Sequence, residues 1–111
     1  MRLRDYLAVP YMLEAETIEV SGGAWVSRVS YPELPGCVAQ AAVVEDALRT
    51  LERLRIETIL AMVEAGQRPP VPRPPLQLCD PAWIAAEAGL PHETVARIAG
   101  DHLKTRDDKP R

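Results

Sequence analysis

The stretch Tyr31-Pro32-Glu33-Leu34-Pro35-Gly36-Cys37 lies between two short runs of strand-forming residues, residues 24–31 and residues 37–41. Proline fixes φ at about −65° and glycine readily takes positive φ, so Pro35 followed by Gly36 predicts a sharp reversal of the chain. A strand on each side of such a turn indicates an antiparallel pair. We expect a structural role, rather than direct chemistry, for the turn residues Pro32, Leu34, Pro35, Gly36 and Cys37.

Residues 6–20, upstream of this turn, are rich in strand-forming residues and alternate in part between apolar and polar side chains. The Ser21-Gly22-Gly23 that follows is a turn signal, so residues 6–20 and residues 24–31 predict an antiparallel hairpin. Pro10 has no backbone donor, which indicates an edge strand or a bulge at that point.

Helical periodicity replaces the strand pattern from Val43 and continues to Ala65. One apolar stripe repeats at intervals of three and four residues, as in an amphipathic helix, and comprises Val44, Ala47, Leu48, Leu51 and Leu54. The opposite face is charged and is expected to be solvated; it carries Glu45, Asp46, Arg49, Glu52, Arg53 and Glu57. Gly66 stands where a glycine commonly ends a helix, and Pro69 follows three residues later.

A second apolar stripe, formed by Ile56, Leu60 and Val63, occupies the last turns of the same helix. One sheet cannot cover both stripes, because the second is rotated by roughly 120° from the first. Two interpretations remain open. Either the helix lies between the sheet and the C-terminal part of the chain, or these three residues form a subunit interface in a homodimer or tetramer.

A proline-rich segment, residues 67–75, contains five of the 11 prolines and cannot form a helix or a central strand. We therefore divide the chain into a body, residues 1–79, and a C-terminal unit, residues 80–111. Asp80 followed by Pro81 predicts a helix start, with the carboxylate as the N-cap acceptor and proline at the first helical position.

The C-terminal unit is similar to a helix-turn-helix, because Ala85, Gly89 and Val95 have the spacing of that motif. In this interpretation the second helix begins near Pro91 and presents candidate DNA-binding residues to the major groove: His92, Glu93, Ala96 and Arg97, with Lys104 as a further candidate. Residues 80–111 contain five Lys or Arg and six Asp or Glu, a net charge of −1, which is poor for contact with phosphates. The alternative is a helical hairpin that packs on the body or on a second subunit.

The composition excludes several classes of protein. The chain has 13 Lys and Arg against 16 Asp and Glu, a net charge of −3, so it cannot coat nucleic acid by bulk charge. Hydrophobic residues make up 47% of the chain, which is enough for a core. No apolar run has the length of a signal peptide or a membrane span, so we expect a cytoplasmic protein in which Cys37 and Cys79 stay reduced.

The sequence does not predict a catalytic site. Glu14, Glu16 and Glu19 lie along one strand, and no set of carboxylates is expected to converge on metal ions. The cysteines and histidines also lack the close spacing of zinc ligands: Cys37, Cys79, His92 and His102. We therefore expect a binding protein with no enzymatic activity, no metal, no cofactor and no small-molecule substrate.

The turn at residues 31–37, followed by Val38-Ala39-Gln40 and by Glu45-Asp46-Ala47-Leu48 at the start of the helix, resembles the HicB antitoxin family. The exit Gly66-Gln67-Arg68-Pro69-Pro70-Val71-Pro72 is also similar, and the resemblance covers residues 6–79. Several separate elements agree in order and spacing. The resemblance places Ala47 and Leu48, together with the turn, among the structural residues of the family motif.

The resemblance implies an α+β fold of β-β-β-α-β order, like a truncated ribonuclease H domain, in which Leu76-Gln77-Leu78-Cys79 supplies the last strand. HicB-type proteins bind and block a small mRNA-cleaving HicA toxin, and many repress their own operon through a C-terminal DNA-binding unit. The expected partners are therefore a HicA-type toxin and operator DNA. The other hypotheses are a stand-alone DNA-binding regulator, an orphan protein-interaction module without a toxin partner, and a metal-dependent nuclease that uses Glu45 and Asp46.

Overall fold

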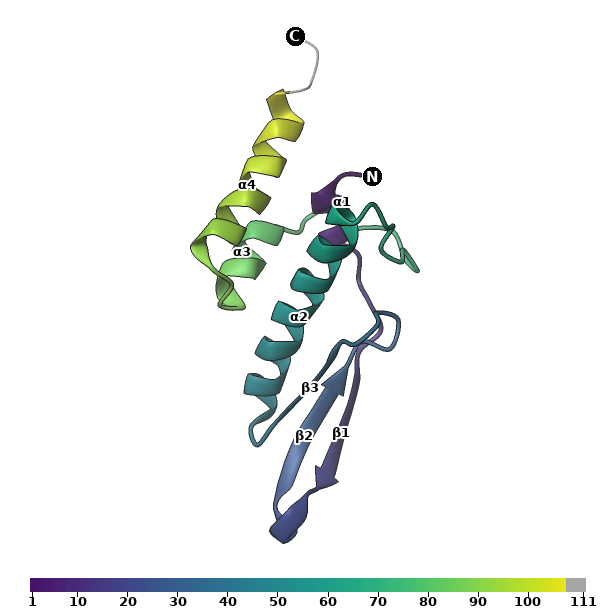
Figure 1. Ribbon diagram of the computed structural model, residues 1–111, viewed down its shortest axis with the longest axis vertical. Coiled ribbons are helices and arrows are strands. Elements are labelled where there is room, and N and C mark those ends of the chain that lie inside the picture. Colours follow the sequence, from purple (N-terminus) through teal and green to yellow (C-terminus); the bar gives the residue numbers. More distant parts are fainter. Residues whose placement is uncertain (108–111) are drawn as a thin grey trace.

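Three strands form an antiparallel sheet in the order β1-β2-β3, and one long helix packs on one of its faces (Figure 1). The computed structural model describes the backbone of residues 1–107 and the side chains of residues 1–100. Its elements are the strands β1 (Glu14–Glu19), β2 (Trp25–Ser30) and β3 (Val38–Ala41), the helices α1 (Leu3–Leu7), α2 (Val44–Glu64), α3 (Pro81–Glu87) and α4 (His92–Asp107), and a short 3-10 turn at Ser21–Gly23. The chain therefore has an α+β fold.

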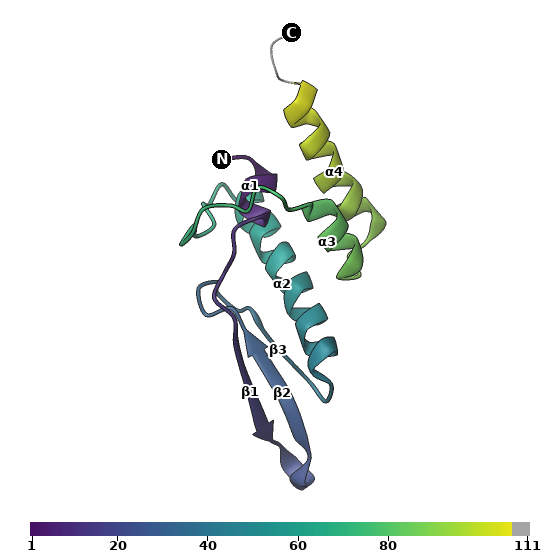
Figure 2. The ribbon, with the colours of Figure 1, turned by 180° about the vertical axis from the view of Figure 1, so that it is seen from behind.

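The predicted hairpin is confirmed: β1 and β2 pair in register from Glu14 opposite Ser30 to the turn at Ser21–Gly23. β3 pairs with β2, and Val29 lies opposite Ala39 on the face that α2 covers. Val29 and Ala39 are both buried, so the main core lies between the β2–β3 part of the sheet and α2. The hairpin tip and α4 extend from the molecule in opposite directions (Figure 2).

The N-terminal part of the predicted first strand is wrong, because residues 3–7 form the helix α1. The backbone N–H of Arg2 donates to the Asp5 carboxylate at 3.0 Å, which satisfies a donor at the start of this helix. Leu7 and the two residues after it are buried in the core. Burial against α2 therefore outweighs the strand preference of the segment, and β1 begins only at Glu14.

The turn at residues 31–37 has the predicted reversal. Gly36 has φ +74°, and the N–H of Tyr31 donates to the carbonyl of Cys37 at 3.0 Å. Leu34 and Cys37 point into the core and are almost fully buried. The turn thus closes the end of the β2–β3 pair and also contributes two side chains to the core.

The long helix α2 also agrees with the prediction, and its end is a Schellman motif. The N–H of Gln67 donates to the carbonyl of Met62 at 2.8 Å, and the N–H of Gly66 donates to the carbonyl of Val63 at 3.1 Å. This arrangement needs a left-handed residue, which Gly66 supplies with φ +75°. Ala47 and Leu51, from the first apolar stripe, are fully buried.

The second apolar stripe of α2 is covered by the chain itself. Ile56 is 0% exposed and Leu60 is 8% exposed, and Val63 is partly buried against the same core. The helix α1 contacts both α2 and α4, and Ile98 of α4 belongs to the same buried cluster. The chain therefore covers Ile56 and Leu60 itself and partly covers Val63, which agrees with the first of the two interpretations.

The predicted last strand, residues 76–79, does not form, and Leu78 projects fully into solvent. The preceding prolines, Pro74 and Pro75, cannot donate to a sheet ladder. The N–H of Leu76 instead donates to the carbonyl of Ala8 at 2.9 Å, which holds the segment beside the end of α1. Within the described residues the sheet therefore has three strands.

We predict that Leu51→Ala destabilises the protein by about 2–5 kcal/mol, because a fully buried leucine leaves a cavity when it is truncated. Urea denaturation at neutral pH measures this loss. Val44→Ala on the same helix is the control, since Val44 is 38% exposed and should change the free energy of unfolding by less than about 1 kcal/mol. Equal losses for the two variants would contradict the core described above.

Candidate functional site

A buried polar cluster of Tyr31, Glu52 and Arg55 holds the turn against α2. The Arg55 guanidinium is paired with the Glu52 carboxylate by two hydrogen bonds, at 2.8 Å and 3.0 Å. The Tyr31 hydroxyl donates to the same carboxylate at 2.8 Å. Arg55 also donates to the carbonyl of Leu7 at 2.8 Å. One guanidinium therefore ties together the turn, the end of α1 and the middle of α2.

The helical periodicity predicts Glu52 on the solvated face of the helix and does not indicate this cluster. The structure instead places the Glu52 carboxylate in hydrogen-bond contact with Tyr31 and Arg55. Arg55 is only 5% exposed and was assigned no role. A signal was present: Arg55 lies four residues after Leu51 and four before Ile59, so it stands within the buried stripe.

The cluster shifts the pKa values of its members. Burial alone would raise the pKa of Glu52, but the hydrogen bonds and charge of Arg55 outweigh it and hold the pKa below the usual value. Burial and the neighbouring Glu52 carboxylate raise the pKa of the Tyr31 hydroxyl, which therefore stays protonated as a donor. Burial alone would lower the pKa of the Arg55 guanidinium, but the hydrogen bonds and charge of Glu52 outweigh it and raise this pKa. Arg55 and Glu52 are therefore ionised and paired at neutral pH, with the guanidinium buried and the carboxylate partly exposed.

A second cluster fixes the proline-rich segment to the body. Arg73 donates to the Glu33 carboxylate at 2.8 Å and to the carbonyl of Pro10 at 3.3 Å. The N–H of Met12 donates to the same Glu33 oxygen at 2.8 Å. The hydrogen bond from Arg73, together with that from the Met12 N–H, holds the pKa of the Glu33 carboxyl below its usual value. The proline-rich segment is thus bound along the chain before β1.

The helix-turn-helix and the helical-hairpin interpretations both predict two C-terminal helices joined by a tight turn, and α3 and α4 have this arrangement. The Asp80 carboxylate caps α3 by accepting the N–H of Trp83 at 3.3 Å. Ala85 is fully buried and Gly89 has φ +82°, as the motif requires, and Val95 packs partly buried against the core. The N–H of Leu90 donates to the carbonyl of Ala85 at 3.1 Å and closes the turn.

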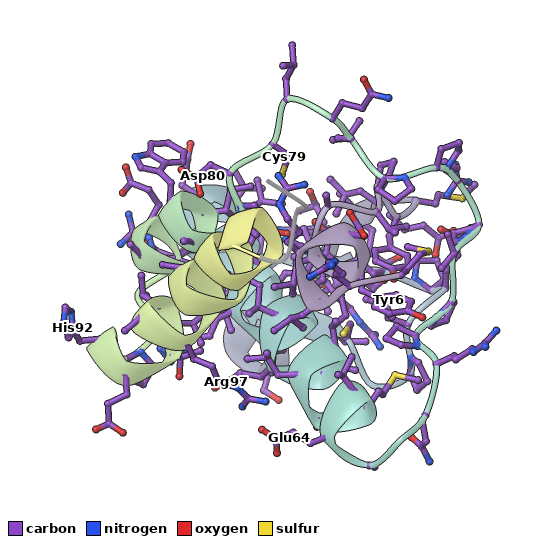
Figure 3. The ribbon with its side chains drawn as sticks, turned by 90° about the horizontal axis from the view of Figure 1, so that it is seen from above. Tyr6, Glu64, Cys79, Asp80, His92 and Arg97 are labelled. Atoms are coloured by element: carbon purple, nitrogen blue, oxygen red, sulfur yellow. The ribbon has the colours of Figure 1, made fainter. Side chains whose placement is uncertain are left out.

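Among the described side chains of α4, the DNA-binding candidates are not brought together as a cationic surface. His92, at the first turn of α4, points away from the body, while Arg97 and Glu64 of α2 point toward each other (Figure 3). Arg97 and Glu64 form an ion pair, so the guanidinium is engaged by the chain's own carboxylate. Glu93 and Ala96 are exposed. Lys104 lies on α4, but its side chain is outside the described residues.

Leu48 of the family motif lies at a groove between α2 and α3. The groove has a volume of about 220 Å³ and is mostly apolar; its lining is Leu48, Arg49, Glu52, Ile84, Glu87 and Ala88. Leu48 is partly buried against the core. Ala47, its neighbour in the motif, is fully buried, so both residues have packing roles.

Neither a metal cluster nor a membrane helix is found in the described part of the chain. Among those residues, no group of three or more His, Cys, Asp or Glu is placed to hold a metal ion. Glu45 and Asp46, the acids of the nuclease hypothesis, are exposed in the first turn of α2. None of the helices searched within the described range is long and apolar enough to span a bilayer. Cys37 and Cys79 are both free thiols.

No family model, no curated protein and no solved structure matches this chain.

We predict that Glu52→Gln lowers the free energy of unfolding at pH 7 by about 1.5–3 kcal/mol, the usual value of a hydrogen bond to a charged group. The pKa of Glu52 is depressed in the folded protein, so its contribution is present above its ordinary pKa of 4.5 and is lost as the pH falls through the folded value. The difference between wild type and variant should therefore shrink below pH 4.5, as measured by denaturation at several pH values. Glu57→Gln, on the exposed face of α2, is the control, and an undiminished difference at low pH would contradict the ion pair.

Proposed function

We propose that the chain is an antitoxin of the HicB type, which binds and neutralises a small mRNA-cleaving HicA toxin in the cytoplasm. The observation that carries the proposal is the turn at residues 31–37, whose side chains Leu34 and Cys37 pack beneath α2. The residues of the family motif thus form one continuous structural unit of hairpin, turn, third strand and helix. The order β-β-β-α supports a truncated ribonuclease-H-like fold in this proposal, although residues 76–79 do not supply its last strand.

The charge of the protein also supports a cationic partner. The chain carries a net charge of −3, and β1 contributes three glutamates with no cation among its six residues. A small ribonuclease that binds mRNA must present positive charge to the phosphates. Opposite charges accelerate the encounter of two proteins and help to exclude wrong partners.

We also propose that α3 and α4 read operator DNA in a homodimer or tetramer, since paired half-sites are the usual target of a helix-turn-helix. The buried Ala85 and the left-handed Gly89 support this role. The engaged Arg97 opposes it, because the guanidinium must leave Glu64 before it can contact a phosphate. The alternatives are a stand-alone DNA-binding regulator and an orphan protein-interaction module.

We predict that the purified protein binds the product of a short neighbouring reading frame and inhibits its cleavage of mRNA. Co-expression should restore the growth that this product suppresses, and the two proteins should elute as one complex. Deleting residues 80–111 is unsuitable as a test, because Ala85, Leu90 and Ile98 belong to the common core. The exposed double variant His92→Ala/Glu93→Ala should instead keep inhibition intact. Failure of the wild type to bind or inhibit refutes the antitoxin proposal.

We predict that Glu64→Gln increases binding to a DNA duplex from upstream of the gene, because it releases Arg97. The gain should be at most about fivefold, since an exposed ion pair is worth about 1 kcal/mol or less. Arg97→Ala should weaken binding and reduce its dependence on salt, as expected for a lost phosphate contact. Gel-shift titrations at several salt concentrations measure both effects. DNA affinity that is unchanged in both variants would show that this part of α4 does not contact DNA.

A further inference from the structure

The strand β1 forms one open edge of the sheet. Figures 1 and 2 both show it on the side of β2 that is away from β3 and α2. The N–H of Val20 donates to the carbonyl of Ala24 at 2.8 Å, which identifies the hydrogen-bonded pairs of this antiparallel ladder. These pairs alternate along an antiparallel ladder. The backbone groups of Ala15, Thr17 and Glu19 therefore point outward, without a partner in the sheet.

The edge has room for a further strand. Ala15 lies opposite Val29 and Thr17 lies opposite Ser27, so both side chains are on the face that α2 covers further along the sheet. Both are nevertheless exposed, which shows that α2 does not extend over them. Natural sheets often block an edge with proline, a bulge or an inward-pointing charge. The continuous register of β1 contains no bulge and no proline. On the face that β1 shares with Val29, Ala15 and Thr17 are small and uncharged, and Glu19 at the hairpin end is the charged residue.

The charge at this edge selects the kind of strand that can bind. Glu14 and Glu16 lie on the open face of the sheet, where a hollow of about 330 Å³ also involves Arg28 and Ser30. Glu19 adds a third carboxylate toward the hairpin tip. Pairing with β1 of a second copy would bring glutamates of the two strands together, and like charges across a strand pair are destabilising. A strand with Lys or Arg at alternate positions meets Glu14 and Glu16 favourably.

We propose that β1 is a docking strand, to which an extended, cationic segment of a partner protein adds as a fourth strand. Backbone hydrogen bonds to Ala15, Thr17 and Glu19 supply affinity, and Glu14 and Glu16 select positive side chains, as in other cases of strand addition. This inference rests on the proposed function, because it takes the partner to be the mRNA-cleaving toxin. It assigns the toxin to the β1 edge of the three-stranded sheet.

The test compares variants of the two sheet edges in the full-length protein. Thr17→Pro removes an outward N–H from β1 without removing a hydrogen bond to β2. Gln40→Pro is the matched change on β3, because the backbone N–H of Gln40 also points away from β2. Glu14→Lys/Glu16→Lys reverses the charge of the edge. Glu57→Lys/Glu87→Lys makes the same change in net charge on exposed helical positions. Circular dichroism and thermal unfolding establish that each variant is folded.

Binding of the purified product of the neighbouring reading frame is then titrated, with amide hydrogen exchange followed in the complex. We expect the β1 variants to weaken binding by about tenfold or more, which corresponds to about 1.4 kcal/mol, and the control variants to bind like wild type. The amides of Ala15, Thr17 and Glu19 should exchange quickly in the free protein and become protected in the complex.

Each other outcome decides against the docking strand. Wild-type binding that the β1 variants retain in full overturns the docking strand but leaves the antitoxin proposal standing. Protection at Gln40 instead assigns the partner to β3, and concentration-dependent protection of β1 in the free protein assigns the edge to a second copy. Absence of wild-type binding refutes the antitoxin proposal and this inference together.

Discussion

The fold depends on one buried cation, the guanidinium of Arg55. It binds the Glu52 carboxylate with two hydrogen bonds and the carbonyl of Leu7 with a third, while Tyr31 donates to the same carboxylate. A buried charge is tolerated only when its partners are all in place, because an unpaired ion in the interior costs several kcal/mol. The hydrogen bonds of Arg55 and Glu52 therefore fix the relative positions of α1, the turn and α2 as one unit.

This constraint explains why the protein is more integrated than a body with a separate C-terminal unit. The helix α1 is held against α2 by Arg55, and it contacts α4 on its other side. The proline-rich segment is bound along residues 8–12 through Glu33, Arg73 and the hydroxyl of Tyr11, which donates to Pro70 at 2.7 Å. The helices α3 and α4 consequently complete the core that also supports the sheet.

The same arrangement determines which surfaces remain accessible to a partner protein. The apolar faces of α2 are used within the chain, whereas β1 keeps an open edge with exposed glutamates. Arg97, the only Lys or Arg between residues 80 and 103, is paired with Glu64, which would compete with a phosphate for the guanidinium. In the proposed antitoxin, protein binding thus uses a free surface, and DNA binding requires an existing ion pair to open.

Local signals in the sequence determined the hairpin, the Pro35-Gly36 reversal, the helix from Val43 to Ala65 and the Asp80 cap. Each depends on the φ preference of a single residue, on a cap or on a short periodicity, so neighbours along the chain are sufficient to predict it. Only the tertiary structure decided that residues 3–7 are helical, that residues 76–79 form no strand, that Arg55 is buried and that Ile56 and Leu60 are covered. These features depend on contacts between segments about 50 or more residues apart, such as Arg55 with Leu7 and Leu76 with Ala8, and no local pattern encodes such contacts.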